Sequence, residues 1–173
     1  MKGFLKKNLR AGIVCFVVLL LLSHCGRERR GAEGEAPEFS LVTLENQEIR
    51  LSDLRGQVVL LDFWATWCGP CRESIPHLVA LSKNYQSKGL QVIGLSVDKG
   101  DVSVVRKFVQ SMEIPYPVAL ATEEVVKKYG VTSLPTTVLI DKKGTIREKM
   151  VGFSSAVAKR LNGRIEELLN ARP

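Results

Sequence analysis

The sequence has few of the residues that bind metal ions: it contains two histidines and four cysteines, and it lacks a second Cys-x-x-Cys pair. A structural zinc site needs four ligands, so neither a metal nor another cofactor is expected. Aromatic residues make up only 6% of the chain, and no basic stripe with interleaved aromatic residues is present. Nucleic acid is therefore not an expected partner. With 173 residues and no internal repeat, the chain has room for one domain.

Positive charge is concentrated at the N-terminus. Of the formal net charge of +7, four units come from Lys2, Lys6, Lys7 and Arg10, which leaves +3 from residue 26 onward. The stretch 11–23 that follows them is apolar and carries no charge, and this order is typical of a bacterial export signal. Its 13 residues are fewer than the roughly 20 that a helix needs to cross a bilayer.

The apolar stretch ends in Leu22-Ser23-His24-Cys25, which resembles a lipobox, the motif whose cysteine is lipidated and becomes the mature N-terminus. His24 departs from that motif, because the position before the cysteine is usually small. Three alternatives remain for residues 1–25: a lipoprotein leader with lipid on Cys25, an uncleaved membrane anchor, and a signal for free secretion. Each places the domain on the extracytoplasmic, periplasmic side of a bacterial cell envelope.

The rest of the chain is predicted to be a short linker followed by one α/β domain. Residues 26–36 mix Arg, Glu, Gly and Ala without apolar periodicity, which favours a flexible tether, and the domain is expected to span 37–173. A capped helical turn is expected at 52–54. Strands are predicted at 39–44, 48–51, 58–64, 90–97, 117–120, 136–140 and 145–151, and helices at 71–88, 101–112, 122–129 and 154–170. This alternation predicts a sheet covered on both faces, with ligands at the C-terminal ends of its strands.

Cys68 and Cys71 follow the continuous apolar run 58–64, which is typical of a central strand buried on both faces. Two thiols separated by Gly-Pro at the start of a helix indicate a reversible dithiol. The helix N-terminus favours the thiolate of Cys68, and Pro70 suits an early helical position. We therefore predict that Cys68 is the attacking thiol and that Cys71, one turn along, resolves the mixed disulfide.

Other interpretations of the same pair remain open. The two cysteines are also compatible with a structural disulfide, or with a non-enzymatic carrier of a soft cation such as Cu(I). A peroxiredoxin-like thiol peroxidase is a further alternative, but its peroxidatic cysteine follows a Pro-x-x-x-Thr-x-x-Cys pattern. Cys68 has neither the matching proline nor the matching threonine.

The segment from Asp62 to Cys71 resembles the active-site strand and loop of thioredoxin, including a proline five residues after the second cysteine. Downstream, Leu134-Pro135-Thr136 resembles the thioredoxin cis-proline loop, and Val151-Gly152 resembles the glycine before its last helix. The wider layout is similar to the membrane-anchored relatives of the TlpA and ResA type. That resemblance implies a thioredoxin-like α/β fold with a central mixed sheet, an N-terminal β-hairpin and a mid-domain helix and strand insertion.

The resemblance also implies an exported, membrane-tethered thiol-disulfide oxidoreductase that acts through a mixed disulfide. The Gly-Pro pair resembles reducing thioredoxin, at about −270 mV, more than the oxidant DsbA, at about −120 mV, so reduction of protein disulfides is the expected direction. The expected partners are exported proteins with disulfides, apocytochrome c among them, and a membrane thiol-transfer protein as electron donor. Some relatives in cytochrome c maturation carry an acidic residue where this chain has Ser74, which weakens an assignment to that pathway.

Asp62 is a lone carboxylate in the apolar run, so we expect it to be buried with a raised pKa. In thioredoxin the matching carboxyl exchanges a proton with the second cysteine, and the lysine that partners it aligns with Gly94. The alternative is an exposed aspartate near the end of a strand.

Five further residues are expected to bind the client protein: Trp67, Gly69, Pro70, Leu134 and Pro135. Trp67 is predicted to form an exposed apolar rim beside Gly69 and Pro70, whereas Trp64 is predicted to lie in the core. If the bond before Pro135 is cis, as the resemblance implies, the backbone groups of Leu134 can pair with an extended client segment. The alternative is a proline that merely starts an edge strand.

Overall fold

The computed structural model describes residues 34–172, so the leader, Cys25 and most of the predicted tether lie outside the described residues. Among the residues described, no helix has the length and apolar character required to span a membrane. The strands are β1 (Gly34–Glu35), β2 (Ser40–Val42), β3 (Glu48–Arg50), β4 (Val58–Trp64), β5 (Leu90–Ser96), β6 (Val118–Leu120), β7 (Thr136–Ile140) and β8 (Thr145–Val151). The α-helices are α2 (Gly69–Tyr85), α3 (Val102–Ser111), α4 (Glu123–Lys128) and α5 (Ser155–Asn170), and short 3-10 helices are η1 (Leu51–Leu54) and η2 (Gln86–Lys88).

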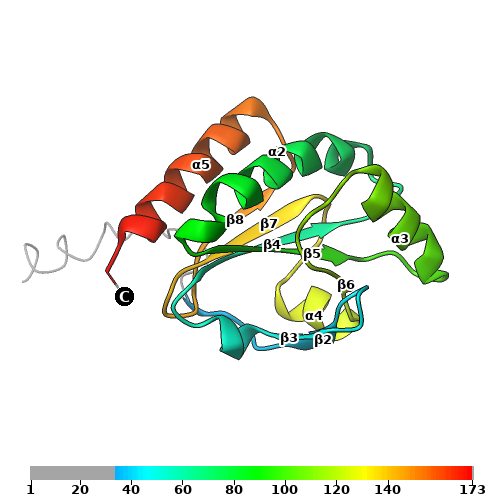
Figure 1. Cartoon of the computed structure of the whole chain (residues 1–173), viewed down its shortest axis with the longest axis horizontal. Helices are drawn as coiled ribbons and strands as arrows, with labels where there is room; N and C mark the ends of the chain where they lie inside the picture. Colours follow the sequence, from blue (N-terminus) through cyan, green and yellow to red (C-terminus); the bar gives the residue numbers. More distant parts are fainter. Residues whose placement is uncertain (1–33, 173) are drawn as a thin grey trace, which may run out of the picture. The chain divides into compact units, whose positions relative to one another are not determined.

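Six strands form one mixed sheet in the order β1-β8-β7-β4-β5-β6, and β2 and β3 form a separate hairpin (Figure 1). The β4–β5 and β5–β6 pairs are parallel, and the other pairs are antiparallel. The prediction of an α/β fold with a mixed sheet, an N-terminal hairpin and an inserted helix and strand, here α3 and β6, is confirmed.

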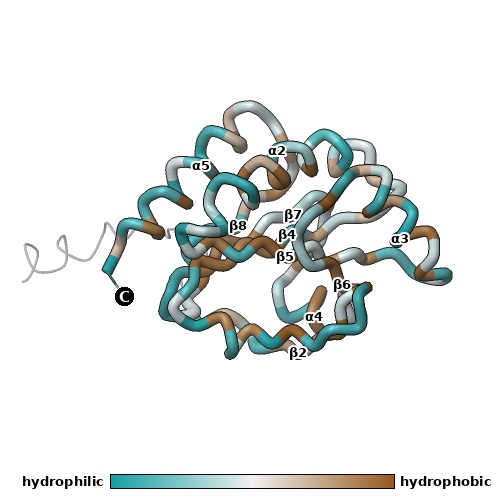
Figure 2. The backbone as a smooth tube through the Cα atoms, viewed as in Figure 1, coloured by the Kyte–Doolittle hydropathy of each residue, from teal (hydrophilic) through white to brown (hydrophobic). Residues whose placement is uncertain are grey.

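The central strand β4 is buried along its whole length because it packs between two apolar cores. Leu60 and Trp64 point to the core formed with α2, α3 and α5, and Leu61 and Phe63 point to the core formed with α4 and the hairpin. Figure 2 shows hydrophobic residues along the strands in the middle of the molecule, while the helices alternate between hydrophobic and hydrophilic segments. A continuous apolar run is what such a two-sided environment requires.

Most predicted limits differ from the structure by one or two residues, and three differences concern where an element or the fold begins. Gly34 and Glu35 pair with β8, and Ala36 is buried, so the fold begins before the predicted boundary at residue 37. The helical turn η1 starts at Leu51, one residue earlier than predicted, and has no side-chain cap. Leu51 is buried, and its amide donates a hydrogen bond to the carbonyl of Phe39. Helix α2 begins at Gly69 rather than residue 71 and ends at Tyr85, after which η2 completes the segment.

The topology brings three chain segments together at one end of the sheet. β4 and β5 are parallel and end side by side at Trp64 and Ser96, and β7 runs antiparallel to β4, so β7 begins at the same end. The cysteines, the loop after β5 and the loop before β7 therefore meet there. β1 pairs with the first residues of β8, at the opposite end of the sheet.

Candidate active site

Cys68 and Cys71 form a disulfide with an S–S distance of 2.01 Å at the start of α2. Cys68 is the N-cap residue, and its sulfur accepts a hydrogen bond of 3.2 Å from the amide of Cys71. Pro70 lies in the first turn, as expected. In the reduced protein this amide and the helix dipole both stabilise a thiolate on Cys68.

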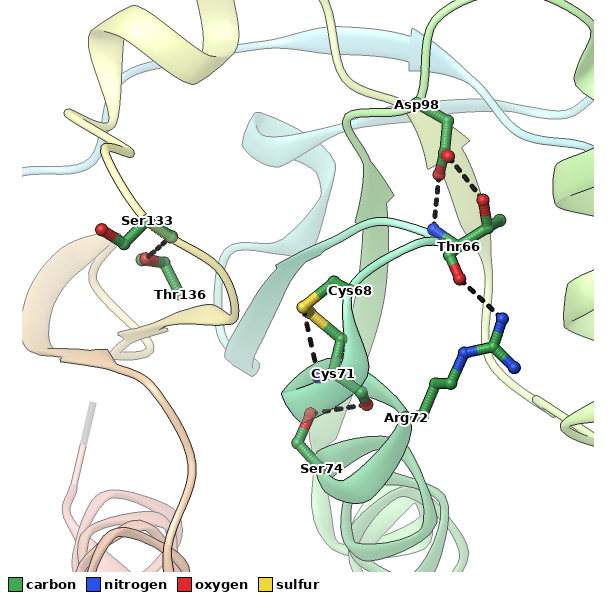
Figure 3. The surroundings of a disulfide bond; sticks show 8 residues. All are labelled: Thr66, Cys68, Cys71, Arg72, Ser74, Asp98, Ser133 and Thr136. Atoms are coloured by element: carbon green, nitrogen blue, oxygen red, sulfur yellow. Dashed lines mark hydrogen bonds between the residues drawn. A yellow bond between two sulfur atoms is a disulfide. The ribbon is translucent and has the colours of Figure 1, made fainter.

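The two sulfurs differ in their access to solvent. Cys68 is 5% exposed, and Cys71 is fully buried beneath it. Cys68 is therefore the more accessible residue of the pair. Ser74, at the position where some relatives carry an acidic residue, is buried and donates a hydrogen bond of 2.9 Å to the carbonyl of Cys71 (Figure 3).

The loop before Cys68 is held by side chains that the sequence did not single out (Figure 3). The carboxylate of Asp98 accepts hydrogen bonds from the amide of Thr66 at 2.9 Å and from its hydroxyl at 2.7 Å. Ser96 donates a third hydrogen bond to Asp98 at 2.8 Å. On the other side of the loop, the guanidinium of Arg72 donates to the carbonyl of Thr66 at 2.8 Å and lies over the ring of Phe108. The amide and the carbonyl of Thr66 are therefore both hydrogen-bonded to side chains.

Asp62 is fully buried on the face of β4 that α2 covers, and within the described chain neither of its carboxylate oxygens has a hydrogen-bond partner. Burial raises the pKa of Asp62 to about 7. Its partner across the β4–β5 pair is Gly94, so no lysine lies beside it on that strand. The predicted burial and raised pKa are confirmed, and its role as a proton acceptor stays a prediction.

A hollow of about 590 Å³ opens beside the dithiol. It is lined by predicted client-binding residues together with residues of the loops after β5 and before β7 and of α4: Trp67, Cys68, Gly69, Pro70, Val97, Val126, Val131, Thr132, Ser133 and Leu134. Trp67 is 72% exposed, whereas Trp64 is fully buried, as predicted for each.

The bond between Leu134 and Pro135 is cis, as the resemblance implied. Pro135 is buried and does not line the hollow; its carbonyl accepts a hydrogen bond of 2.8 Å from the amide of Gly152. Among the described residues, neither the amide nor the carbonyl of Leu134 has a backbone partner. The pairing of these two groups with an incoming strand stays a prediction.

Comparison with known proteins gives the same family by three routes. A profile described as the AhpC/TSA family matches residues 32–149. The thiol-disulfide oxidoreductase ResA of Bacillus thuringiensis subsp. konkukian is 36% identical over 151 residues, which cover 79% of this chain and 87% of that protein. The chain belongs to the AhpC/TSA family. It is a thiol-disulfide oxidoreductase of the ResA type.

Solved structures agree with this assignment. A Chlorobium tepidum protein, provisionally named thiol:disulfide interchange protein DsbE, is 35% identical with a TM-score of 0.76, and the match covers 81% of this chain and 99% of that one. The exposed lipoprotein thioredoxin Etrx1 of Streptococcus pneumoniae strain TIGR4 is 25% identical with a TM-score of 0.67, and the match covers 76% of this chain and 100% of that one. The thioredoxin-like fold of this family member is thereby established.

Sequence reasoning missed the Asp98 contacts and the apolar residues of the loops around the hollow. The signal for Asp98 was present, because it follows a buried strand adjacent and parallel to the one that delivers the cysteines. The carboxyl ends of neighbouring parallel strands meet at one edge of a sheet, so a polar residue there belongs beside the site.

Proposed function

We propose that this protein is exported, is tethered to the periplasmic side of the cytoplasmic membrane, and reduces disulfides of other exported proteins. The observation that carries the proposal is the asymmetry of the two sulfurs. Cys68 caps a helix and lines the hollow, and Cys71 is buried. This arrangement suits an attacking thiol followed by a resolving one.

The reaction begins when the Cys68 thiolate attacks one sulfur of the client disulfide. The client S–S bond breaks, a bond forms between Cys68 and the client, and the displaced sulfur leaves as a thiolate that takes a proton from water. Cys71 then gives its proton to the carboxylate of Asp62 and attacks the sulfur of Cys68. The bond to the client breaks and the client sulfur leaves as a second thiolate, which takes a proton from water. The client has then gained two electrons, and the Cys68–Cys71 disulfide has formed.

The hollow supplies the contacts that hold the client during these steps. An extended client segment can hydrogen-bond to the free amide and carbonyl of Leu134, while its apolar side chains contact Trp67 and Val131. Main-chain pairing gives affinity without strict sequence preference. We therefore infer clients with an exposed, extended segment next to the disulfide.

Export and tethering are supported by the leader sequence and by the position of β1. The chain enters the fold at the end of the sheet opposite to the dithiol, so a tether on that side leaves the hollow free for clients. Etrx1, one of the structural relatives, is named an exposed lipoprotein. As a reductant in an oxidising compartment, the protein needs electrons from a membrane thiol-transfer protein.

Insulin reduction by the reduced protein tests the enzymatic function. We expect catalytic turnover in the wild type and its loss in both Cys68→Ser and Cys71→Ser. Absence of turnover together with stoichiometric retention of Cu(I) would instead support the metal-carrier alternative. Peroxide consumption that outpaces insulin reduction under the same conditions would favour the thiol peroxidase.

Two further experiments address the tether and the clients. Labelling cells with a palmitate analogue should mark the wild-type protein, and a Cys25→Ser variant that still incorporates label would eliminate lipidation at Cys25. Covalent capture of clients by Cys71→Ser in cells should identify the exported proteins, and the presence of apocytochrome c among them would assign the protein to cytochrome c maturation.

A further inference from the structure

Three buried polar groups without a hydrogen-bond partner in the described chain lie on the face of the sheet beneath α2. They are the carboxylate of Asp62, the indole N–H of Trp64 and the hydroxyl of Tyr116, and all three residues are at least nine-tenths buried. Buried polar groups in proteins are almost always satisfied, so three unsatisfied groups in one core require an explanation. One acceptor and two donors also form a complementary set.

Gly94 lies beside all three residues. It is paired with Asp62 across the β4–β5 ladder, and paired residues on neighbouring strands present their side chains to the same face of the sheet. A Cβ atom on Gly94 would lie 3.0 Å from the indole nitrogen of Trp64 and 3.3 Å from Cε2 of Tyr116. The two donor-bearing rings therefore occupy the space where a side chain beside Asp62 would otherwise lie.

The negative charge of Asp62 also acts on Tyr116. Burial raises the pKa of the Tyr116 hydroxyl well above its usual value, and the charge of Asp62 raises it further. Tyr116 consequently stays protonated and remains a donor throughout the range in which Asp62 titrates. Burial is the cause of the raised pKa of Asp62.

The remaining neighbours of Asp62 are neutral. Its register partners are Gly94 on β5 and Thr137 on β7, and the core on the same face includes Cys71 on α2, Val105 and Phe108 on α3, Val118 on β6, and Leu161, Ile165 and Leu168 on α5. Of these, the Cys71 thiol of the reduced protein is the one titratable group. Cys71 thus shares the core on this face of the sheet with Trp64 and Tyr116.

We propose that Tyr116 is a positioning residue for the proton that Asp62 accepts from Cys71, and that its hydroxyl, with the indole N–H of Trp64, donates hydrogen bonds to the ionised carboxylate through one buried water. The inference rests on the proposed role of Asp62 as proton acceptor. When Cys71 attacks, its proton moves to a carboxylate oxygen, and the hydrogen bonds from Tyr116 and Trp64 weaken as the negative charge is lost. The donors thus favour the ionised form of Asp62 without a charged partner.

The test compares Tyr116→Phe with Tyr129→Phe. Tyr116 and Tyr129 are equally buried, but Tyr129 lies in the opposite core and donates to the carbonyl of Pro37 at 2.7 Å. Two quantities are followed against pH: the carboxyl carbon resonance of Asp62 in the oxidised protein, and the rate of insulin reduction. Thermal unfolding of each variant reports whether the fold is intact.

We expect Tyr116→Phe to raise the midpoint of the Asp62 titration by about one pH unit, because a donor to the charged form is lost. The pH at which the rate of insulin reduction rises should move by the same amount. Tyr129→Phe should lower thermal stability and move neither midpoint. An Asp62 midpoint that stays in place in Tyr116→Phe, or that moves equally in Tyr129→Phe, would overturn the inference.

The same experiment separates this inference from the role of Asp62 itself. If Asp62→Asn keeps the wild-type rate profile, Asp62 does not accept the proton, and both the proposed role and the inference fail. If Asp62→Asn removes the rise of the rate with pH, and Tyr116→Phe leaves the midpoint of that rise unchanged, the role of Asp62 stands and only the inference fails. Gly94→Ala reaches the contact by another route, because its Cβ would displace the rings of Trp64 and Tyr116, and we expect the same direction of shift.

Discussion

One aspartate lies on β4, the strand that precedes the dithiol, and another follows the neighbouring strand β5, and their surroundings are opposite. Asp98 lies at the rim of the site, by which we mean the loop 65–67 before Cys68 and its contacts, and it accepts three hydrogen bonds from Thr66 and Ser96. Asp62, behind the cysteines, is fully buried and has no partner among the described residues. A carboxylate with hydrogen-bond partners stabilises the local structure, whereas a buried carboxylate without partners takes up a proton readily. We therefore expect Asp98 to fix the geometry of the loop before Cys68 and Asp62 to take part in proton transfer.

The largest expected effect is on catalysis at Asp62. Asp62→Asn should lower the rate of insulin reduction by about 100-fold near pH 7, because the proton of Cys71 loses its acceptor. The loss should shrink above about pH 9, where the thiol ionises by itself. Rates measured from pH 6 to pH 10 check this, and a variant that matches the wild type at every pH would contradict it.

The second expectation is that asparagine has opposite effects on stability at the two positions. The pKa of Asp62 moves from 3.8 in the unfolded chain to about 7 in the folded one, so the native state binds the extra proton between these values. Wild-type stability therefore falls as pH rises through that window, and the loss is complete above about pH 7. Asp62→Asn should raise the free energy of unfolding by up to about 4 kcal/mol at pH 8, and by nothing at pH 3.

At the rim, Asp98→Asn should instead lower the free energy of unfolding, by about 2 kcal/mol, because an amide cannot accept all three hydrogen bonds. Denaturant titrations of both variants at pH 8 measure the two changes. If the two substitutions changed stability in the same direction, the distinction between the two aspartates would be lost.

The positions of the two aspartates differed in how far the sequence could predict them. Asp62 stands out because a charge interrupts an apolar run, and this contrast is local. The contact of Asp98 with Thr66 joins residues 32 positions apart, and only the parallel pairing of β4 and β5 brings them together. Pairing across the sheet is also why β1 was missed: Gly34 and Glu35 have no apolar pattern of their own and become a strand only against β8.

Strand limits were predicted best where turn residues mark them. The strands β7 and β8 match their predicted limits, since a cis-proline loop and the turn at Asp141 to Gly144 bound them. Tyr116 could not be singled out, because the importance of its hydroxyl depends on the space beside Gly94, which exists only in the folded sheet.

A smaller effect is expected at the rim from Thr66→Val. This change removes the hydroxyl contact with Asp98 and keeps the amide contact, so it should cost about 1 kcal/mol of stability. The rate of insulin reduction should fall only a few-fold, without a change in the shape of its pH profile. A shifted pH profile would mean that the rim also takes part in proton transfer.

The smallest effect on the fold is expected at Trp67, which is exposed. Trp67→Ala should change stability by less than about 0.5 kcal/mol. It should raise KM for a protein disulfide several-fold and leave the rate with a small disulfide such as oxidised glutathione unchanged. Equal losses with both substrates would place Trp67 in the chemistry rather than in client binding.

The most direct test of the account is to trap the mixed disulfide with purified protein. Reduced Cys71→Ser is mixed with a client disulfide, and the products are analysed by intact mass spectrometry and peptide mapping. We expect a stable one-to-one adduct through Cys68 that dithiothreitol releases, and no comparable adduct with Cys68→Ser. An adduct that forms equally well through Cys71, or no adduct with either variant, would contradict the assignment of Cys68 as attacking thiol and Cys71 as resolving thiol.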